Sequence, residues 1–402
     1  MNQLWRQLAI ATNWPVMVAI VVLSSMGMIS IWAHSAADAR AAGDAKKQLI
    51  LIGIGMACML LMQLWNYQRI ARWAWPFYFF SLLLLLYTVM PGVPSSGFLG
   101  VPRVNGAKAW IKLGVINLQP AELTKVAFCM VLSRYLRFRS NYRALWGLAP
   151  PFLLAVVPLM LIMKQPDLGT ALVFIPALFA MLFVAGAKVR HLGIIVGTGL
   201  LLAPLAWYSG PKETTGMERD LPILRHVPAL VEPYQRQRVA AMFSRDPSVL
   251  RDKGFQQEQA LTAFGSGGFA GRGAMQIPVG RTVPEAHNDM IFALIGEQFG
   301  FIGSVILLGA YLVLFATGIE IASNTREPFG KLVAVGIVSL LAGQTFLNLM
   351  VAVRLMPVTG VTLPFVSAGG SSLLASFIAA GLLLNIGQNR PIVIAKDAFE
   401  FD

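Results

Sequence analysis

Long apolar runs, separated mostly by short polar segments, dominate the chain. Ten runs reach roughly membrane length and are centred on residues 16–33, 48–65, 75–90, 121–137, 148–163, 170–186, 192–208, 290–317, 331–355 and 364–388. A helix crosses the hydrocarbon core of a bilayer with about 20 mainly apolar residues. We therefore predict an all-α polytopic membrane protein of about ten transmembrane helices. The chain forms one integral-membrane domain, 1–402, with a long loop at 209–288 between the seventh and eighth helices.

Composition narrows the class of protein further. Hydrophobic residues make up 56% of the chain and charged residues 13%, which excludes an ordinary soluble globular domain. Cys58 and Cys129 lie inside apolar runs, so we interpret them as packing residues without thiol or disulfide chemistry. The net charge of +13 indicates anionic surroundings, either lipid headgroups or an anionic substrate. Because the basic residues are spread among the apolar runs, we expect membrane lipids as partners and no nucleic acid.

Basic residues in the short loops predict the orientation. They gather on one side of the predicted bundle, in 68–73, 134–143, 188–191 and 326–331 and at Arg390. Loops rich in Lys and Arg stay on the cytoplasmic side of a membrane. We therefore expect both termini in the cytoplasm and the opposite loops outside. Those outer loops are 34–47, 91–118, 164–169, 209–288 and 356–363.

The outer segment 283–292 carries the strongest sign of chemistry. Here the long polar loop turns into an apolar helix, and ionisable residues at the edge of a membrane helix indicate function by default. Glu285, His287 and Asp289 alternate along the chain, which would point all three one way if the segment is extended. If the helix starts near Asn288, Asp289 lies in its first turn. The alternative is that Asn288 or Asp289 only caps the helix.

Two other outer segments place charged residues at the starts of predicted helices. In 118–125, Glu122 and Lys125 are three residues apart and share one helix face. They either belong to a site or form an ion pair that stabilises the start of the helix. In the turn before the sixth predicted helix, Asp167 either belongs to the site or caps that helix.

Two irregular segments also lie on the outer side. Residues 355–372 hold prolines and paired glycines within an apolar run, which predicts a broken or re-entrant helix. Such backbone is tolerated at membrane depth only where it lines a cavity. The glycine-rich stretch 265–273 lacks the features of a nucleotide site, and we interpret it as a flexible loop suited to a place near a lipid-linked phosphate.

Six motifs occur in order along the chain, within a match that covers almost its whole length. They are NGAKAWI at 105–111, QPAELTK at 119–125, KQPDLGT at 164–170, GSGG at 265–268, PEAHNDMIF at 284–292 and the segment 356–372, from MPVTG to SAGGSS. Together they resemble the SEDS family, the cell-wall glycosyltransferases of the RodA and FtsW type. The form QPDLGT and the short N-terminal tail look more like RodA than FtsW. The chain departs from the family's usual pattern at Arg354, where a glycine is usual, and at Ala368, where a tyrosine is usual.

The resemblance implies a peptidoglycan glycosyltransferase that polymerises lipid II on the outer face of the bacterial cytoplasmic membrane. The role would be cell elongation or shape, as for RodA, or division, as for FtsW. A sugar hydroxyl attacks the anomeric carbon of a lipid-linked strand and expels polyprenyl pyrophosphate in an inverting displacement. This reaction needs a general base and positive charge at the leaving group, and Asp289 matches the family's essential aspartate. A divalent cation, Mg²⁺ or Mn²⁺, or the outer Arg and Lys residues could meet the leaving group.

The resemblance also implies a substrate cavity, while any metal ligands stay unknown. For Arg354 two accounts stay open: the guanidinium snorkels to the membrane interface, or it binds the pyrophosphate bidentately. The family works with a class B penicillin-binding protein that cross-links the strands, so we expect such a partner. The predicted substrate-binding residues are Trp110, Lys112, Glu122, Lys125, Lys164, Asp167, Glu285, His287, Arg354, Ser367, Ser371 and Ser372.

Functions of a different class stay open as well. Many helices, a broken helix and charges inside the membrane also fit a transporter, which here would be a lipid II flippase. We find no convincing internal repeat, and the motifs gather on the outer side instead of at the midplane. A purely structural scaffold for a cell-wall complex is a third interpretation, and it leaves Asp289 without a purpose.

Overall fold

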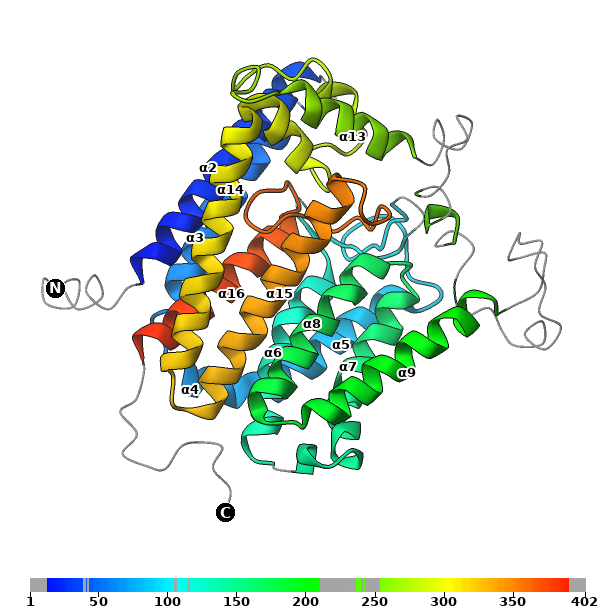
Figure 1. Cartoon of the computed structure of the whole chain (residues 1–402), viewed down its shortest axis with the longest axis vertical. Helices are drawn as coiled ribbons and strands as arrows, with labels where there is room; N and C mark the ends of the chain where they lie inside the picture. The colour runs from blue at the N-terminus through cyan, green and yellow to red at the C-terminus, as the bar shows by residue number, and fades with distance from the viewer. Residues whose placement is uncertain are drawn as a thin grey trace, which may run out of the picture.

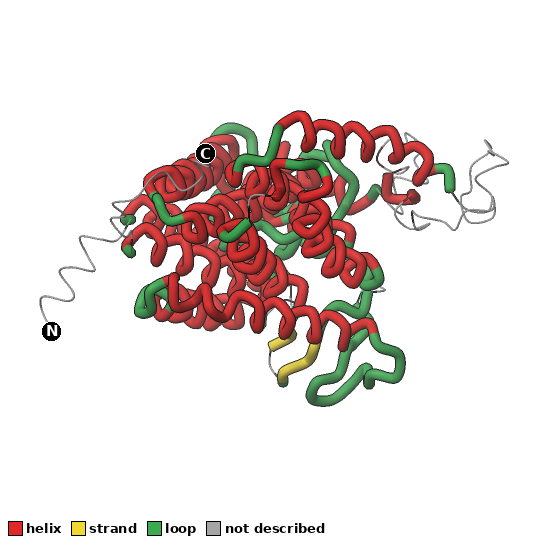
Figure 2. The backbone as a smooth tube through the Cα atoms, turned by 90° about the horizontal axis from the view of Figure 1, so that it is seen from below, coloured by secondary structure: helices red, strands yellow, loops and turns green. Residues whose placement is uncertain are grey.

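The computed structural model describes residues 13–38, 41, 43–104, 107–114, 116–139, 141–209, 231, 236–239, 242 and 254–389. Helices dominate these residues. The α-helices are α2 (Trp14–Ala37), α3 (Asp44–Leu61), α4 (Tyr67–Ile70), α5 (Ala74–Val89), α6 (Pro120–Arg137), α7 (Ala149–Met163), α8 (Leu168–Ala185), α9 (Val189–Trp207), α13 (Phe255–Ser266), α14 (Ile291–Asn324), α15 (Pro328–Ala352) and α16 (Gly370–Gln388). The 3₁₀ helices are η2 (Ala71–Trp73), η3 (Asn141–Arg143), η4 (Trp146–Leu148) and η6 (Gly280–Thr282). The strands β1 (Ile111–Leu113) and β2 (Ile116–Leu118) form an antiparallel hairpin, drawn in yellow in Figure 2.

The helices confirm the all-α polytopic prediction. Within the described residues, nine helices are long and apolar enough to cross a membrane. The predicted span 121–137 is helix α6, which is too charged to count among them, because its 18 residues carry Glu122, Lys125, Arg134 and Arg137. Fourteen of those 18 residues are buried, so α6 is surrounded by protein. A central helix of this kind can hold charges that a lipid-facing helix cannot.

The helices form two packed groups that meet at α15 (Figure 1). On one side α14 packs on α2 and α16 packs on α3, around one apolar core. On the other side α5, α6, α7 and α8 share a second core, which α15 joins through its contact with α8. Helix α9 lies at the outside of this group, with only Leu192 buried. The interface between the two helix groups contains the buried polar residues described below.

A kink divides α14 near its start. Gly300 has φ 62° and ψ −156°, a conformation open to glycine but to few other residues. The glycine-rich stretch 265–273 packs against this kink, with Gly267 and Gly271 touching the backbone carbonyls of Gly296 and Gln298. No Cβ would fit at these two contacts. Close packing therefore explains Gly267 and Gly271, whereas an added Cβ at Gly265 or Gly268 would meet nothing within 4 Å. That the stretch is a flexible loop near a lipid-linked phosphate stays a prediction.

The chain breaks between α15 and α16, as predicted. Residues 353–369 contain no helix, and α16 begins at Gly370, later than the residue 364 expected from the apolar pattern. Val361, Leu363 and Phe365 are nevertheless buried within this segment. Non-helical backbone at that depth needs partners for its polar groups. The polar side chains that supply them form much of the site.

The two ends of the bundle differ in their polar groups. Helix α13 and the break after α15 lie at one end, whereas α4 lies at the other (Figure 1). Asn13 and Gly387 touch each other, so the first and last described helices begin and end on the same side. On that side Arg134 Nη1 donates to the carbonyl oxygen of Ala71 at 2.7 Å, and Arg137 pairs with Glu327 at 3.1 Å.

Candidate active site

Asp289 lies in a turn before α14, and its side chain points into the protein. The helix begins at Ile291, with Met290 as N-cap and no side-chain cap. The expectation that it starts near Asn288 is therefore wrong, and so is the capping interpretation of Asp289. The residue is 7% exposed, and its Oδ1 accepts a hydrogen bond of 3.1 Å from Gln256 Nε2. Burial raises the pKa of Asp289 to about 7, against a backbone hydrogen bond to its carboxyl and the hydrogen bond from Gln256.

Glu285, His287 and Asp289 do not point one way. Residues 284–290 form turns, and Glu285 has a φ of 51°. The exposed Glu285 accepts a hydrogen bond of 2.6 Å from Asn288 Nδ2. His287 stacks on His34 with ring centroids 5.1 Å apart. Of the three predicted residues, only Asp289 is buried.

The segment around Asp289 rests on the break between α15 and α16. Asn348, buried in α15, donates to the carbonyl oxygen of Asp289 at 2.8 Å and to that of Val361 at 2.7 Å. The Ser367 hydroxyl donates to the carbonyl oxygen of Asn288. The backbone N–H of Ala368 donates to the carbonyl oxygen of His287 at 2.9 Å. The broken helix thus forms a support that fixes the backbone on which Asp289 is carried.

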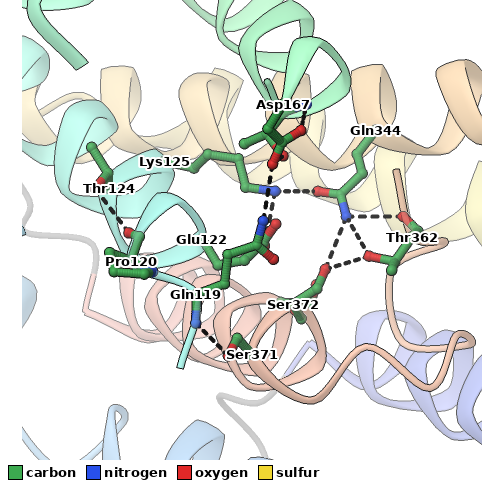
Figure 3. Close-up of polar contacts among 12 residues, drawn as sticks. Gln119, Pro120, Glu122, Thr124, Lys125, Asp167, Gln344, Thr362, Ser371 and Ser372 are labelled. Atoms are coloured by element: carbon green, nitrogen blue, oxygen red, sulfur yellow. Dashed lines mark hydrogen bonds and ion pairs between the residues drawn. The ribbon is translucent and has the colours of Figure 1, made fainter. Parts of the chain in front are cut away.

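A buried ion pair forms a second polar cluster on α6 (Figure 3). Lys125 Nζ lies 2.9 Å from Glu122 Oε2, and both side chains are 6% exposed. Lys125 also donates to Gln344 Oε1 of α15 at 2.7 Å. Gln344 Nε2 in turn donates to the carbonyl oxygen of Thr362 at 2.9 Å and to Ser372 Oγ at 3.0 Å. The predicted pair exists, and it is linked to the broken helix instead of standing alone at a helix start.

Asp167 caps α8 and lies next to the ion pair on α6, and its part in substrate binding stays a prediction. It caps α8, accepting from the Thr170 N–H at 3.0 Å and the Thr170 hydroxyl at 2.8 Å. It also accepts a hydrogen bond of 3.0 Å from Gln119 Nε2, beside the ion pair in Figure 3. Burial raises the pKa of its carboxyl, and the bonds from Thr170 oppose that rise. Ser371 accepts from the Gln119 N–H at 2.8 Å and donates to the carbonyl of Asn117 at 2.7 Å, which ties β2 to α16.

The remaining predicted residues lie further out. Trp110 and Lys112 are half-buried beside or within β1, and Lys164 is exposed. Arg354 Nη1 pairs with Glu258 of α13 at 3.1 Å, and its Nη2 lies 3.5 Å from the carbonyl oxygen of Met242. The guanidinium thus contacts the outer loop, a partner that neither sequence-based account foresaw. Its binding of pyrophosphate stays a prediction.

Sequence reasoning missed four amides of the site, namely Gln119, Gln256, Gln344 and Asn348. Gln344 and Asn348, four residues apart in a buried helix, both reach the broken segment. Polar residues at that spacing within an apolar run are a signal that could have found them. Gln256 carries no such signal, because it is one of several glutamines in a polar stretch. In the part of the chain that the structure describes, no group of three or more His, Cys, Asp or Glu side chains could hold a metal ion.

Comparison with known proteins places this geometry in a family. The model of the FtsW, RodA and SpoVE cell cycle proteins matches residues 13–391. The chain belongs to the FtsW/RodA/SpoVE family. It is 34% identical to a probable peptidoglycan glycosyltransferase FtsW of Trichlorobacter lovleyi, over 95% of each chain. It is 33% identical to stage V sporulation protein E of Bacillus subtilis, over 92% of this chain and 95% of that protein.

Solved structures of the FtsW/RodA/SpoVE family share the fold. A chain of a peptidoglycan synthase complex, in which polymerization and crosslinking are structurally coordinated, superimposes with a TM-score of 0.75 at 30% identity. That match covers 95% of this chain and 99% of the other. Thermus thermophilus RodA, a rod shape determining protein, gives a TM-score of 0.65 at 28% identity, covering 94% and 97%. These identities are below the 34% and 33% of the FtsW and SpoVE relatives, so they do not support the expectation that the chain is nearer to RodA.

Proposed function

We propose that this chain is a peptidoglycan glycosyltransferase that polymerises lipid II, with Asp289 as the general base. The observation that carries the assignment is the environment of Asp289. Its carboxyl is buried, its backbone carbonyl accepts a hydrogen bond from Asn348, and its pKa is raised to about 7. A base whose pKa lies near the operating pH takes up a proton most effectively. Relatives named peptidoglycan glycosyltransferase support the reaction class.

The proposed step is an inverting displacement. The sugar hydroxyl of one lipid II forms a new bond to the anomeric carbon of a lipid-linked strand. Asp289 takes the hydroxyl proton, and the bond from the anomeric carbon to the polyprenyl pyrophosphate breaks. The leaving pyrophosphate carries away the electron pair, and positive charge stabilises it. No covalent intermediate on the enzyme is needed.

Substrate binding is assigned to the buried polar residues along the line where the helix groups meet. The cluster of Lys125, Glu122 and Asp167 would shape the cavity, and Ser367, Ser371 and Ser372 would line its broken-helix wall. The outer cations, among them Lys112 and Lys164, or a divalent cation would meet the pyrophosphate. These roles rest on the resemblance and on the contacts that join the cluster to residues 361–372.

The proposed site lies on the outer face of the bacterial cytoplasmic membrane, with both termini in the cytoplasm. The side opposite Asp289 carries Arg134 and Arg137, in agreement with the positive-inside rule. A class B penicillin-binding protein is the proposed partner. The likeness to a chain from a complex that coordinates polymerization with crosslinking supports such a partner.

Reconstitution tests the base directly. Purified protein with its transpeptidase partner is mixed with labelled lipid II, and glycan strands are separated by length. Asp289→Asn keeps the shape of the side chain but removes the base, so we expect loss of polymerisation with unchanged expression and partner binding. Glu320→Gln, at an exposed carboxylate on α14, the helix that follows Asp289, is the matched control and should polymerise normally.

Two results would contradict this assignment. Long strands made by Asp289→Asn would show that another group is the base. Movement of lipid II across vesicles by the wild-type protein, with no polymerisation, would favour the flippase.

A further inference from the structure

We propose that Gln256 is a positioning residue for Asp289, holding the carboxylate in one orientation and favouring its deprotonated form. This inference rests on the proposed function, since it presumes that Asp289 is the base. It concerns a residue of the outer-loop helix α13, which contributes no reacting group of its own. Gln256 would act only through the aspartate.

The geometry of Gln256 carries the proposal. Its Nε2 donates to Asp289 Oδ1 at 3.1 Å and to the carbonyl oxygen of Pro284 at 3.0 Å. A side-chain amide has two N–H groups, so one nitrogen can make both bonds. One bond holds the carboxylate, and the other holds the start of the turn that carries it.

Neighbouring side chains of α13 hold other parts of the site. Gln257 Nε2 donates to the carbonyl oxygens of Val351 at 3.0 Å and Met356 at 2.7 Å. These two bonds fix α13 on the end of α15 and on the segment that follows it. Gln256 is thereby held in place by a rigid helix, as a side chain that orients a catalytic group must be.

The charge balance gives the expected sign of the effect. Besides burial, a backbone hydrogen bond lowers the pKa of Asp289, Glu285 raises it, and Arg238 and the bond from Gln256 lower it. A donor to a carboxylate stabilises the charged form. Removing that donor therefore raises the pKa of Asp289, and replacing it with a cation lowers the pKa. The acid limb of the rate profile should follow the pKa in each case.

Two substitutions of similar length separate positioning from a structural role. Gln256→Met removes the donor, and we expect the acid limb of kcat to move up by about one pH unit. At pH 7 this corresponds to a fall in kcat of about fivefold, with KM unchanged. Gln256→Lys keeps a donor and adds a positive charge, so the limb should move down in pH. Initial rates at saturating lipid II, measured from pH 5.5 to 9 on the complex with its partner, give the profiles.

Gln259→Met is the matched control. Gln259 lies on the same helix and accepts from the Thr282 hydroxyl at 3.4 Å, away from Asp289. The acid limb of the kcat profile of Gln259→Met should lie at the same pH as that of the wild type. If both Gln256 variants lose rate equally at every pH, or if neither limb moves, Gln256 only braces the turn and the proposal is wrong. Failure of the wild type to polymerise, or activity of Asp289→Asn, would instead overturn the proposed function.

Discussion

Glu122 and Lys125 form an ion pair in a largely buried position. Lys125 makes a further bond to Gln344, so its charge has two acceptors inside the bundle. Desolvation of such a pair offsets much of its attraction, and the net stabilisation of the intact pair is small. Loss of one partner is different, because it leaves a buried charge without compensation.

Single and double substitutions of this pair should therefore differ in stability. Lys125→Met leaves Glu122 alone, and we expect destabilisation by about 3 kcal/mol or more. Glu122→Gln combined with Lys125→Met removes both charges and should recover most of that loss. Thermal unfolding in detergent measures both, with Lys164→Met, at an exposed lysine, as a control that leaves Tm unchanged. A double variant as unstable as Lys125→Met would show that the pair is not what stabilises this region.

Arg354 shows how one residue departs from the family's usual pattern. Its φ of 58° is a conformation that favours glycine, the residue that the resemblance leads us to expect there. An arginine in this region is strained by roughly 1 kcal/mol. The ion pair with Glu258 is partly exposed and offsets at most about 1 kcal/mol. The arginine thus adds a contact to the outer loop without a large gain in stability.

Among the elements, the broken helix is held by close backbone contacts. Gly27 of α2 lies against the backbone of Val366, where no Cβ fits. On the other side, Gly169 of α8 lies against Thr359. A Cβ added at Gly169 would lie only 2.5 Å from the carbonyl oxygen of Thr359. The irregular segment is therefore clamped between two helices from opposite groups. Its conformation is set by packing as much as by its own prolines.

One methyl group on α2 should disturb the segment. Gly27→Ala forces Val366 outward, and we expect a loss of about 1–3 kcal/mol and lower polymerisation, because Ser367 then leaves the carbonyl of Asn288. Gly53→Ala on α3 is the matched control, since nothing lies within 4 Å of its added Cβ. That variant should match or slightly exceed wild-type stability, as alanine favours a helix. Equal Tm values for Gly27→Ala and Gly53→Ala would contradict the proposal that close packing against α2 holds the broken segment.

Elements that depend on local pattern could be predicted from the sequence. The apolar runs and the prolines of 355–372 gave the helices and the break. The start of α14 was misplaced, because bonds from Ser367 and Ala368 hold residues 287 and 288 in a turn. Gln256 was missed for a similar reason, since its partner Asp289 is 33 residues away. No local periodicity encodes which distant polar groups meet.

For the whole molecule, the direction of α6 fixes the two faces. It begins beside Asp167 at Gln119 and ends at Arg137, which pairs with Glu327 at the opposite end of the bundle. Lys164 and Arg139, both exposed, therefore lie on opposite faces. The orientation of these faces in the cell follows from the basic loops.

Thiol labelling of intact cells checks that orientation. In a background of Cys58→Ser and Cys129→Ala, we expect an impermeant reagent to label Lys164→Cys but not Arg139→Cys. Both should react after the cells are opened, which controls for accessibility. Labelling of Arg139→Cys in intact cells would place Asp289 in the cytoplasm and remove the proposed site from its substrate.

The two hydrogen bonds donated by Asn348 set the distance between two segments of the site. One nitrogen spans backbone from residues 59 and 13 positions away, at 2.8 Å and 2.7 Å. The spacing between the peptide of Asp289 and that of Val361 is thus set by the dimensions of a single amide group. The broken segment would line the sugar-binding site, and Asp289 would take the proton. Because Asn348 bonds to both backbones, we expect them to move together. A substrate that displaces the broken segment would therefore also displace Asp289, and the distance between the two can change only as far as the hydrogen bonds of Asn348 can lengthen.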